Sequence, residues 1–185
     1  MNKRDPIVWM GTLALLLAGF LVASSTMAAA ELPDSELVAK LLSEAKTMAF
    51  QLKEDAATME TYTRSDFKWE THAMAITQIK EHVNALERQA AKLNDLRNTA
   101  SPSQKTAIDR IIPFLNELEG YTSAVIDHLN QNPKRLTTPE YKDYLEANAD
   151  YSADLAAMIA NFVDYGKTKE RVARLAAKLE IPAAK

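Results

Sequence analysis

The sequence predicts an all-α protein: an antiparallel up-down-up-down four-helix bundle with a C-terminal helical extension, preceded by a signal peptide. The composition is typical of helical proteins, because 47% of the 185 residues are apolar while only four are Gly and none is Cys. Between Phe67 and Arg97 there is no Gly or Pro, and a stripe recurs at alternating steps of four and three. This stripe is His72, Ile76, Ile79, Val83, Leu86, Ala90, Leu93 and Arg97. A long helix with a single apolar stripe must bury it against other helices.

Residues 1–30 are predicted to be a secretory signal peptide. Lys3 and Arg4 provide a positively charged start, Ile7–Val22 an apolar run, and Ala28–Ala30 a small-residue cleavage site. A retained membrane anchor is the alternative, although this apolar run is shorter than the roughly 20 residues that a spanning helix needs. Cleavage predicts an exported protein, periplasmic or secreted. Since the chain has no Cys, its stability must come from packing rather than from disulfides.

The remaining residues, 31–185, are expected to form a single domain. Its helices are predicted over residues 35–62, 66–98, 102–130 and 138–165, with an extension over 167–180. Short connections make sequential neighbours antiparallel. Asp34 or Ser35 is suited to cap the first helix, and Thr63 or Ser65 the second. The first helix carries a stripe that is apolar except at one position: Val38, Leu41, Ala45, Met48, Leu52, Asp55, Met59 and Tyr62.

Proline accompanies the start of the third and the fourth helix. Ser101–Gln104 combines a capping box with Pro at the first helical position, and Thr138–Glu140 places a cap, a Pro and an acid in order. Pro113 falls inside the third helix, off its apolar stripe, and predicts a bend or a broken turn. Gly166 is a candidate interruption of the fourth helix. The extension beyond it is expected either to overhang the bundle or to bend across its base.

Folding back at these connections brings polar and aromatic residues into one layer near one end of the bundle. The expected members are Asp55, Met59, Trp69, His72, His128, Tyr141 and Tyr144. One interpretation is a cofactor or metal site, which bundles build from inward-facing side chains. His72, Met59 and His128 would then be haem ligands, and His72, His128 and Asp55 ligands of a transition metal. The alternative is a buried hydrogen-bonded pair, Asp55 with His72, that sets helix register.

Two further features involve the fourth helix. Thr122 on the third helix is expected opposite Asn148 and Ser152, which favours a hydrogen-bonded register pairing, with a small polar ligand cavity as the alternative. One flank of the fourth helix is rich in tyrosine, namely Tyr141, Tyr144, Tyr151 and Tyr165. Such a flank is typical of a core edge whose hydroxyls reach water. The alternative is a contact surface for a protein partner.

Several function classes are excluded or disfavoured. Without Cys there is no thiol or iron–sulfur chemistry. The sequence has neither the Glu-x-x-His pattern of carboxylate di-iron bundles nor the His-Glu-x-x-His pattern of zincins. Gly166–Thr168 is not a phosphate loop, because no strand is expected before it. A net charge of −3 without a distinct basic face gives no support for nucleic-acid binding.

Export combined with a helical bundle resembles the periplasmic four-helix cytochromes. The c-type members attach haem through Cys-x-x-Cys-His, which this chain lacks, and the b-type members use a His in the fourth helix, where this chain has none. The sequence therefore predicts an exported, non-enzymatic helical-bundle protein with a binding or structural role. The alternative is a haem- or metal-binding bundle that uses His72 with Asp55, His128 or Met59. Membrane contact is expected only through an uncleaved leader.

Overall fold

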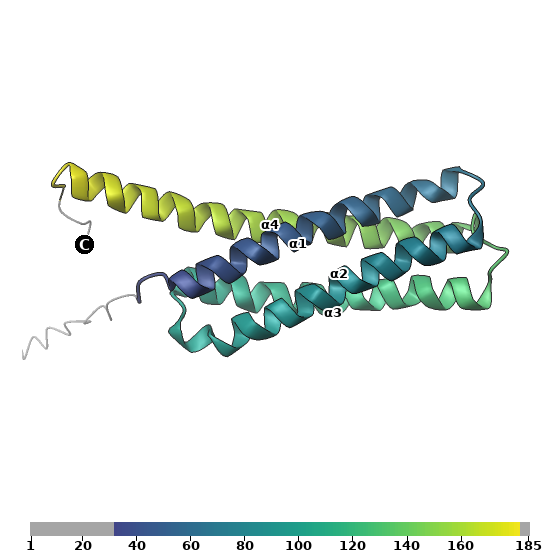
Figure 1. Ribbon diagram of the computed structural model, residues 1–185, viewed down its shortest axis with the longest axis horizontal. Helices are drawn as coiled ribbons and strands as arrows, with labels where there is room; N and C mark the ends of the chain where they lie inside the picture. The colour runs from purple at the N-terminus through teal and green to yellow at the C-terminus, as the bar shows by residue number, and fades with distance from the viewer. Residues whose placement is uncertain (1–31, 182–185) are drawn as a thin grey trace, which may run out of the picture. The chain divides into compact units, whose positions relative to one another are not determined.

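The computed structural model describes residues 32–181, so the predicted signal peptide, residues 1–30, lies outside the described residues. The described chain forms four α-helices and two short 3-10 turns, with no strand (Figure 1). The α-helices are α1 Glu36–Glu60, α2 Trp69–Asp95, α3 Pro102–Gln131 and α4 Pro139–Lys178. The 3-10 turns are Thr61–Arg64, after α1, and Arg97–Thr99, after α2. The all-helical prediction is confirmed.

Three of the four helix starts follow the predicted capping chemistry. Ser35 caps α1, Ser101 and Gln104 form a reciprocal capping box at α3, and Thr138 caps α4. The start of α2 differs from the prediction. The chain continues from α1 into the 3-10 turn and then runs on to Lys68, whose side chain makes no capping hydrogen bond. The connection is therefore longer than the cap-like residues Thr63 and Ser65 suggested.

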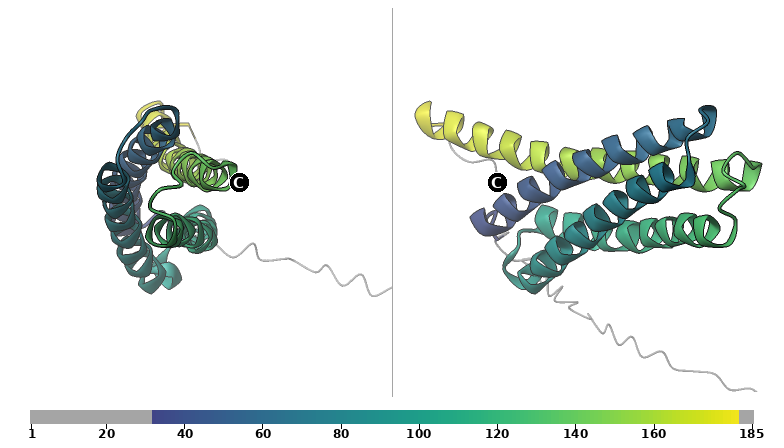
Figure 2. Two further views of the ribbon diagram at one scale, coloured as in Figure 1. Left: turned by 90° about the vertical axis from the view of Figure 1, so that its right-hand side faces the viewer. Right: turned by 45° about the vertical axis from the view of Figure 1, so that its right-hand side comes forward.

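The helices share one apolar core. α1 packs against α2 and α4, and α3 packs against the same two helices (Figure 2). The predicted stripe of α2 is buried from His72 to Leu93. Each helix contributes large side chains that are at most 2% exposed, such as Leu52, Leu86, Leu115 and Leu155. Burial of this apolar surface is the main favourable term that holds the four helices together.

The buried stripe of α1 differs from the predicted one. The structure buries Val38, Leu42, Ala45, Ala49, Leu52, Ala56 and Met59. At three positions the prediction took the neighbouring residue instead, namely Leu41, Met48 and Asp55, of which the first two are half-buried at the core edge. Three of the seven buried residues are alanines, and small side chains at the centre of a stripe let large side chains of facing helices fill the space. Asp55 consequently lies on the flank of α1, not in its core stripe.

α4 is longer than predicted. It continues through Gly166 without interruption and ends at Lys178. Beyond the start of α1 this helix projects past the other three (Figure 1, yellow), so the predicted extension overhangs rather than bending back. The predicted broken turn at Pro113 is also absent, because α3 is one continuous helix with Pro113 on its exposed side. None of the helices between residues 32 and 181 is long and apolar enough to cross a membrane.

Candidate functional site

The structure brings most of the predicted polar layer together around Tyr141, at the end where α2 and α4 begin. The Tyr141 side chain is completely buried. Its hydroxyl lies 2.8 Å from His72 Nδ1, and its ring stacks on that of His128 with centroids 4.8 Å apart. His128 Nε2 lies 3.0 Å from the carbonyl oxygen of Arg135. Each imidazole therefore already has a hydrogen-bond partner inside the protein.

Burial shifts the pKa of two members of this cluster, His72 and Tyr141. It lowers the pKa of His72 and raises the pKa of Tyr141 well above its usual value, because a charged side chain loses its hydration there. Both groups are thus neutral near pH 7 and share one hydrogen bond. The Tyr62 ring packs edge-on against His72, with centroids 5.5 Å apart. His72 lies between two aromatic rings, as a packed core residue does.

The other predicted members of the layer lie around this cluster. The Trp69 indole N–H donates to the carbonyl oxygen of Leu129 at 2.9 Å, which ties the start of α2 to the end of α3. The Tyr144 ring lies edge-on to His128, and its hydroxyl donates to Glu140 on its own helix. Met59 is completely buried in the core. We refer to this end of the four helices as the closed end.

Asp55 does not face His72. Its carboxylate oxygen Oδ2 lies 3.6 Å from Nε2 of His82, a residue that was not among the predicted members of the layer. The reason is the longer connection between α1 and α2, which shifts the register of the two helices so that Tyr62, not Asp55, lies beside His72. At 3.6 Å these two atoms are too far apart for a direct hydrogen bond. Asp55 Oδ2 is buried without a hydrogen-bond partner among the described residues.

The predicted metal ligands are consequently not gathered. Within residues 32–181 no three His, Cys, Asp or Glu side chains are placed to hold a metal ion together. His72 contacts the Tyr141 hydroxyl, His128 stacks on the Tyr141 ring, and Asp55 lies beside His82. The haem set of His72, Met59 and His128 is likewise embedded among packed side chains. The closed end therefore offers structural hydrogen bonds more than ligand positions.

The second predicted polar layer forms between α3 and α4. Asn148 Nδ2 donates to Thr122 Oγ1 at 3.2 Å, and the Thr122 hydroxyl donates to the carbonyl oxygen of Leu118. Ser152 donates to the carbonyl oxygen of Asn148. The Asn148 side-chain oxygen has no hydrogen-bond partner among the described residues. These contacts are those of a cross-helix pairing, and its role in register remains a prediction.

The Tyr-rich flank of α4 is divided between core and surface. Tyr141 is buried, and Tyr144 and Tyr151 are half-buried. Tyr151 packs against Tyr121, with ring centroids 4.8 Å apart. Tyr165 is the strongly exposed member, at 56%. The flank thus combines a core edge with one exposed ring, and a contact surface for a protein partner stays a prediction.

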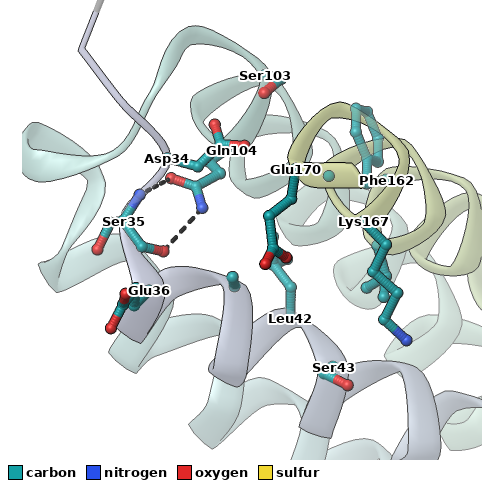
Figure 3. Close-up of a pocket in the computed structure, with 13 residues that line it drawn as sticks. Asp34, Ser35, Glu36, Leu42, Ser43, Ser103, Gln104, Phe162, Lys167 and Glu170 are labelled. Carbon is teal, nitrogen blue, oxygen red and sulfur yellow. Dashed lines mark hydrogen bonds between the residues drawn. The ribbon is translucent and has the colours of Figure 1, made fainter. Parts of the chain in front are cut away.

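An unpredicted pocket lies at the opposite end, where α1 and α3 begin and α4 passes over them (Figure 3). We refer to it as the end pocket, and to this end as the open end. Its volume is about 490 Å³. Its apolar wall is formed by Ala39, Leu42, Phe162, Val163 and Gly166. Its polar rim is formed by Asp34, Ser35, Glu36, Ser43, Ser103, Gln104, Lys167 and Glu170.

Gln104 holds one side of the end pocket in place. Its amide nitrogen donates to the Ser35 carbonyl oxygen, and its amide oxygen accepts from the Ser35 N–H, both at 2.9 Å (Figure 3). The same oxygen accepts from the Ser101 N–H at 3.1 Å. Gln104 thus caps α3 and also joins the start of α1 to the start of α3. We call this contact the Gln104 clip. Because the side chain is only 6% exposed, these bonds are shielded from water.

The pocket exists because α4 has a glycine, Gly166, where a larger side chain would fill the space. A Cβ atom added at Gly166 would meet no other atom within 4 Å. Lys167 and Glu170 extend from α4 across the opening toward α1 (Figure 3). Three carboxylates line the rim, those of Asp34, Glu36 and Glu170, against one ammonium. The Asp34 carboxylate is partly balanced from outside, because Lys169 Nζ lies 3.2 Å from it.

Sequence reasoning missed this pocket, although one signal was present. The face of α4 that buries Ile159 and Val163 continues, at steps of three and four, with Gly166 and Glu170. The apolar stripe thus ends while α1 and α3 still lie alongside. No protein family model matches this chain, and no curated protein or solved structure matches it either. The geometry alone must therefore support a function.

Proposed function

We propose that this chain is an exported, non-enzymatic binding protein that takes a small amphipathic ligand into the end pocket. In this proposal residues 1–30 are a cleaved signal peptide and the protein acts in the periplasm or outside the cell. The remaining chain is an antiparallel up-down-up-down four-helix bundle. The observation that carries the binding role is the end pocket, an apolar hollow with a rigid polar rim.

Contacts between helix ends support the proposed topology. The Gln104 clip joins the starts of α1 and α3. The Trp69 hydrogen bond joins the start of α2 to the end of α3, and the His72–Tyr141 contact joins the starts of α2 and α4. These contacts support a topology in which α1 and α3 run in one direction and α2 and α4 in the other. Alternating directions and short connections are the features of an up-down-up-down bundle.

The chemistry of the lining indicates the class of ligand. A volume of about 490 Å³ is within the usual range of small-molecule pockets. The wall formed by Leu42, Phe162 and Val163 suits an aliphatic or aromatic group. The rim has more carboxylates than cations, so it favours a cationic or neutral polar head and disfavours an anion. We therefore infer a ligand with one apolar body and a cationic or neutral hydrogen-bonding end.

We propose a non-enzymatic role because of the residues that line the pocket. They include three serines but no His, so the pocket lacks the His-activated hydroxyl nucleophile of the Ser-His-Asp type. Ser103 Oγ lies 3.2 Å from Ser101 Oγ, which is another hydroxyl. The haem- or metal-binding alternative has no comparable observation in its favour, because the side chains it needs are packed at the closed end.

A fluorescent probe tests the pocket directly. N-phenyl-1-naphthylamine is neutral and apolar, and it should bind the protein saturably with increased emission. Gly166→Leu fills the space in front of α4 and should weaken this binding at least tenfold. Gly120→Leu is the matched control, because Gly120 is also a helical glycine with open space around its Cβ position but lies outside the pocket. The control should bind the probe like the wild type.

The charge of the probe tests the polarity of the rim. 1-Anilinonaphthalene-8-sulfonate is a similar but anionic dye, and the carboxylates should make it bind more weakly than the neutral one. Equal loss of the neutral dye in both Gly variants, or no loss in either, would remove the end pocket from the proposal. So would tighter binding of the anionic dye.

A further inference from the structure

The C-terminal part of α4 leaves the other three helices and exposes apolar side chains. From Arg171 to Ile181, which we call the overhang, all residues are exposed except the half-buried Ala176. Val172, Leu175 and Leu179 are 60%, 49% and 64% exposed, and Ile181 is 55% exposed. Scattered exposed apolar residues are ordinary, but a continuous stripe of them marks an interaction site.

This apolar stripe is not a continuation of the buried core. At 100° per residue, Val172, Leu175 and Leu179 lie within about 60° of one another around the helix axis. The same geometry places them nearly opposite Ile159 and Val163, which α4 buries against its neighbours. Longer versions of α1 or α3 would therefore not cover the stripe. It faces outward and needs a different partner.

The overhang is a finished helix rather than a frayed end. Glu180 adopts a left-handed conformation with φ of 55°. The Ile181 N–H donates to the carbonyl oxygen of Ala176 at 3.0 Å. This is the hydrogen bond of a Schellman motif, which closes a helix and satisfies its last carbonyl groups. The apolar stripe is thus presented on a defined helical surface.

Basic residues follow the stripe. Residues 167–181 contain five basic side chains and only two acidic ones, in a protein whose net charge is negative. Arg171 and Lys178 run along one border of the apolar stripe. Arg174 pairs with Glu170 and Lys169 with Asp34, while the other three make no ion pair within residues 32–181. The outward face of the overhang is therefore apolar with a cationic border.

We propose that the overhang is a docking helix for an anionic lipid surface. Apolar side chains on one face and Lys or Arg along its edge are the features of helices that lie in the headgroup region. The apolar stripe enters the boundary of the acyl chains, and the basic side chains contact lipid phosphates. This proposal is independent of the end pocket.

Charge explains why contact is limited to the overhang. On the same side of α4, the four-helix part carries Asp143, Asp150 and Asp154, all exposed. An anionic surface repels these carboxylates and attracts the basic border beyond Gly166. The protein therefore approaches a membrane with the end of α4 first and its remaining helices tilted away.

A second copy of this chain fits the stripe less well. The helical part of the overhang is about 12 Å long, so two of them would bury far less than the roughly 800 Å² per partner of a stable interface. Their basic borders would also be placed near each other in many of the pairings. A lipid surface has no such size limit and carries the complementary charge.

Vesicle flotation with the full chain tests the proposal. The protein should float with phosphatidylcholine vesicles that contain one-quarter phosphatidylglycerol, at least about tenfold more than with pure phosphatidylcholine, and high salt should release it. Arg171→Glu with Lys178→Glu should abolish this preference, and Val172→Ser with Leu175→Ser should weaken binding several-fold. Because these side chains face water, circular dichroism should show unchanged helix content.

Matched controls use similar side chains outside the overhang. Lys142→Glu reverses an exposed charge in the first turns of α4, and Met74→Ser removes an apolar side chain that is 75% exposed on α2. Neither should change flotation. Equal binding to neutral and anionic vesicles, or equal effects of control and overhang variants, would overturn the proposal. Sedimentation that shows a dimer lost in Leu175→Ser would overturn it in favour of a second copy.

Discussion

At the closed end, the connections after α1 and α3 fold aromatic residues over the core. Tyr141 is completely buried between two imidazoles, and both His72 and His128 have partners inside the protein. At the open end, Gly166 and Glu170 take the place of apolar residues, so a hollow of about 490 Å³ remains under a rim fixed by Gln104. Both ends contain polar side chains, but one uses them to complete the packing and the other surrounds empty space. The closed end thus has the more reactive side chains, but these are less available to a ligand than the residues of the open end.

The largest difference between the ends should appear in their aromatic residues. Tyr141→Ala removes a completely buried ring and leaves His72 without its partner, so it should cost about 3–5 kcal/mol of unfolding free energy. Phe162→Ala removes a half-buried ring that faces the end pocket, and should cost on the order of 1 kcal/mol. Urea unfolding followed by circular dichroism measures both values. Equal losses would mean that the open end is packed as tightly as the closed one.

The next effect concerns the rim of the open end. Gln104→Ala removes three hydrogen bonds and leaves the buried N–H of Ser101 and the half-buried N–H of Ser35 without their acceptor, so about 1–3 kcal/mol should be lost. The neutral naphthylamine probe should bind more weakly as well, because the entrance of α1 is released. Gln51→Ala, on the exposed side of α1, is the control and should change neither stability nor binding. Loss of stability without any effect on the probe would separate the clip from the pocket.

A smaller effect of opposite sign is expected at Gly166. Gly inside a helix is less favourable than Ala by roughly 0.5–1 kcal/mol, and a Cβ atom at this position meets no neighbour within 4 Å. Gly166→Ala should therefore stabilise the protein by about that amount, and Gly120→Ala should do the same. Thermal unfolding should show both increases. A destabilised Gly166→Ala next to a stabilised Gly120→Ala would show that the end pocket is narrower than described.

The sequence predicted the closed end better than the open one, and the reasons are physical. The connections around α3 are short, so position alone placed His128 beside Tyr141 and Thr122 beside Asn148. The connection before α2 contains residues that resemble caps, and its true length moved Asp55 from His72 to His82.

The pocket was missed for a different reason. It is created by a side chain that is absent, at Gly166, and the pattern of apolar residues indicates what is present. In a sequence, a glycine that interrupts a helix looks the same as a glycine that lines a cavity. A C-terminal helical extension was predicted, but only the continuous course of α4 shows that its apolar residues face away from the core.

Below neutral pH, the pH dependence of stability should come from His72 at the closed end. Unfolded His72 takes up a proton as the pH falls through its ordinary pKa near 6.5, whereas burial lowers the pKa of folded His72. Below that pH the unfolded state therefore binds more protons, and the free energy of unfolding decreases as the pH falls. His72→Gln removes this titration and should make stability depend less on pH between 7 and 5. Denaturant unfolding at several pH values measures the difference, and parallel curves for both proteins would contradict it.

Above pH 10, the pH dependence of stability should come from Tyr141, the hydrogen-bond partner of His72. Burial holds the pKa of folded Tyr141 far above its ordinary value near 10, so above that pH the unfolded state loses a proton that the folded state keeps. Stability therefore falls as the pH rises past 10, and Tyr141→Phe should lessen this fall while keeping the ring. Tyr165→Phe is the control, since its exposed side chain has the same hydroxyl at the open end of α4. If both variants changed the alkaline limb equally, the buried hydrogen bond would not distinguish the closed end from the open one.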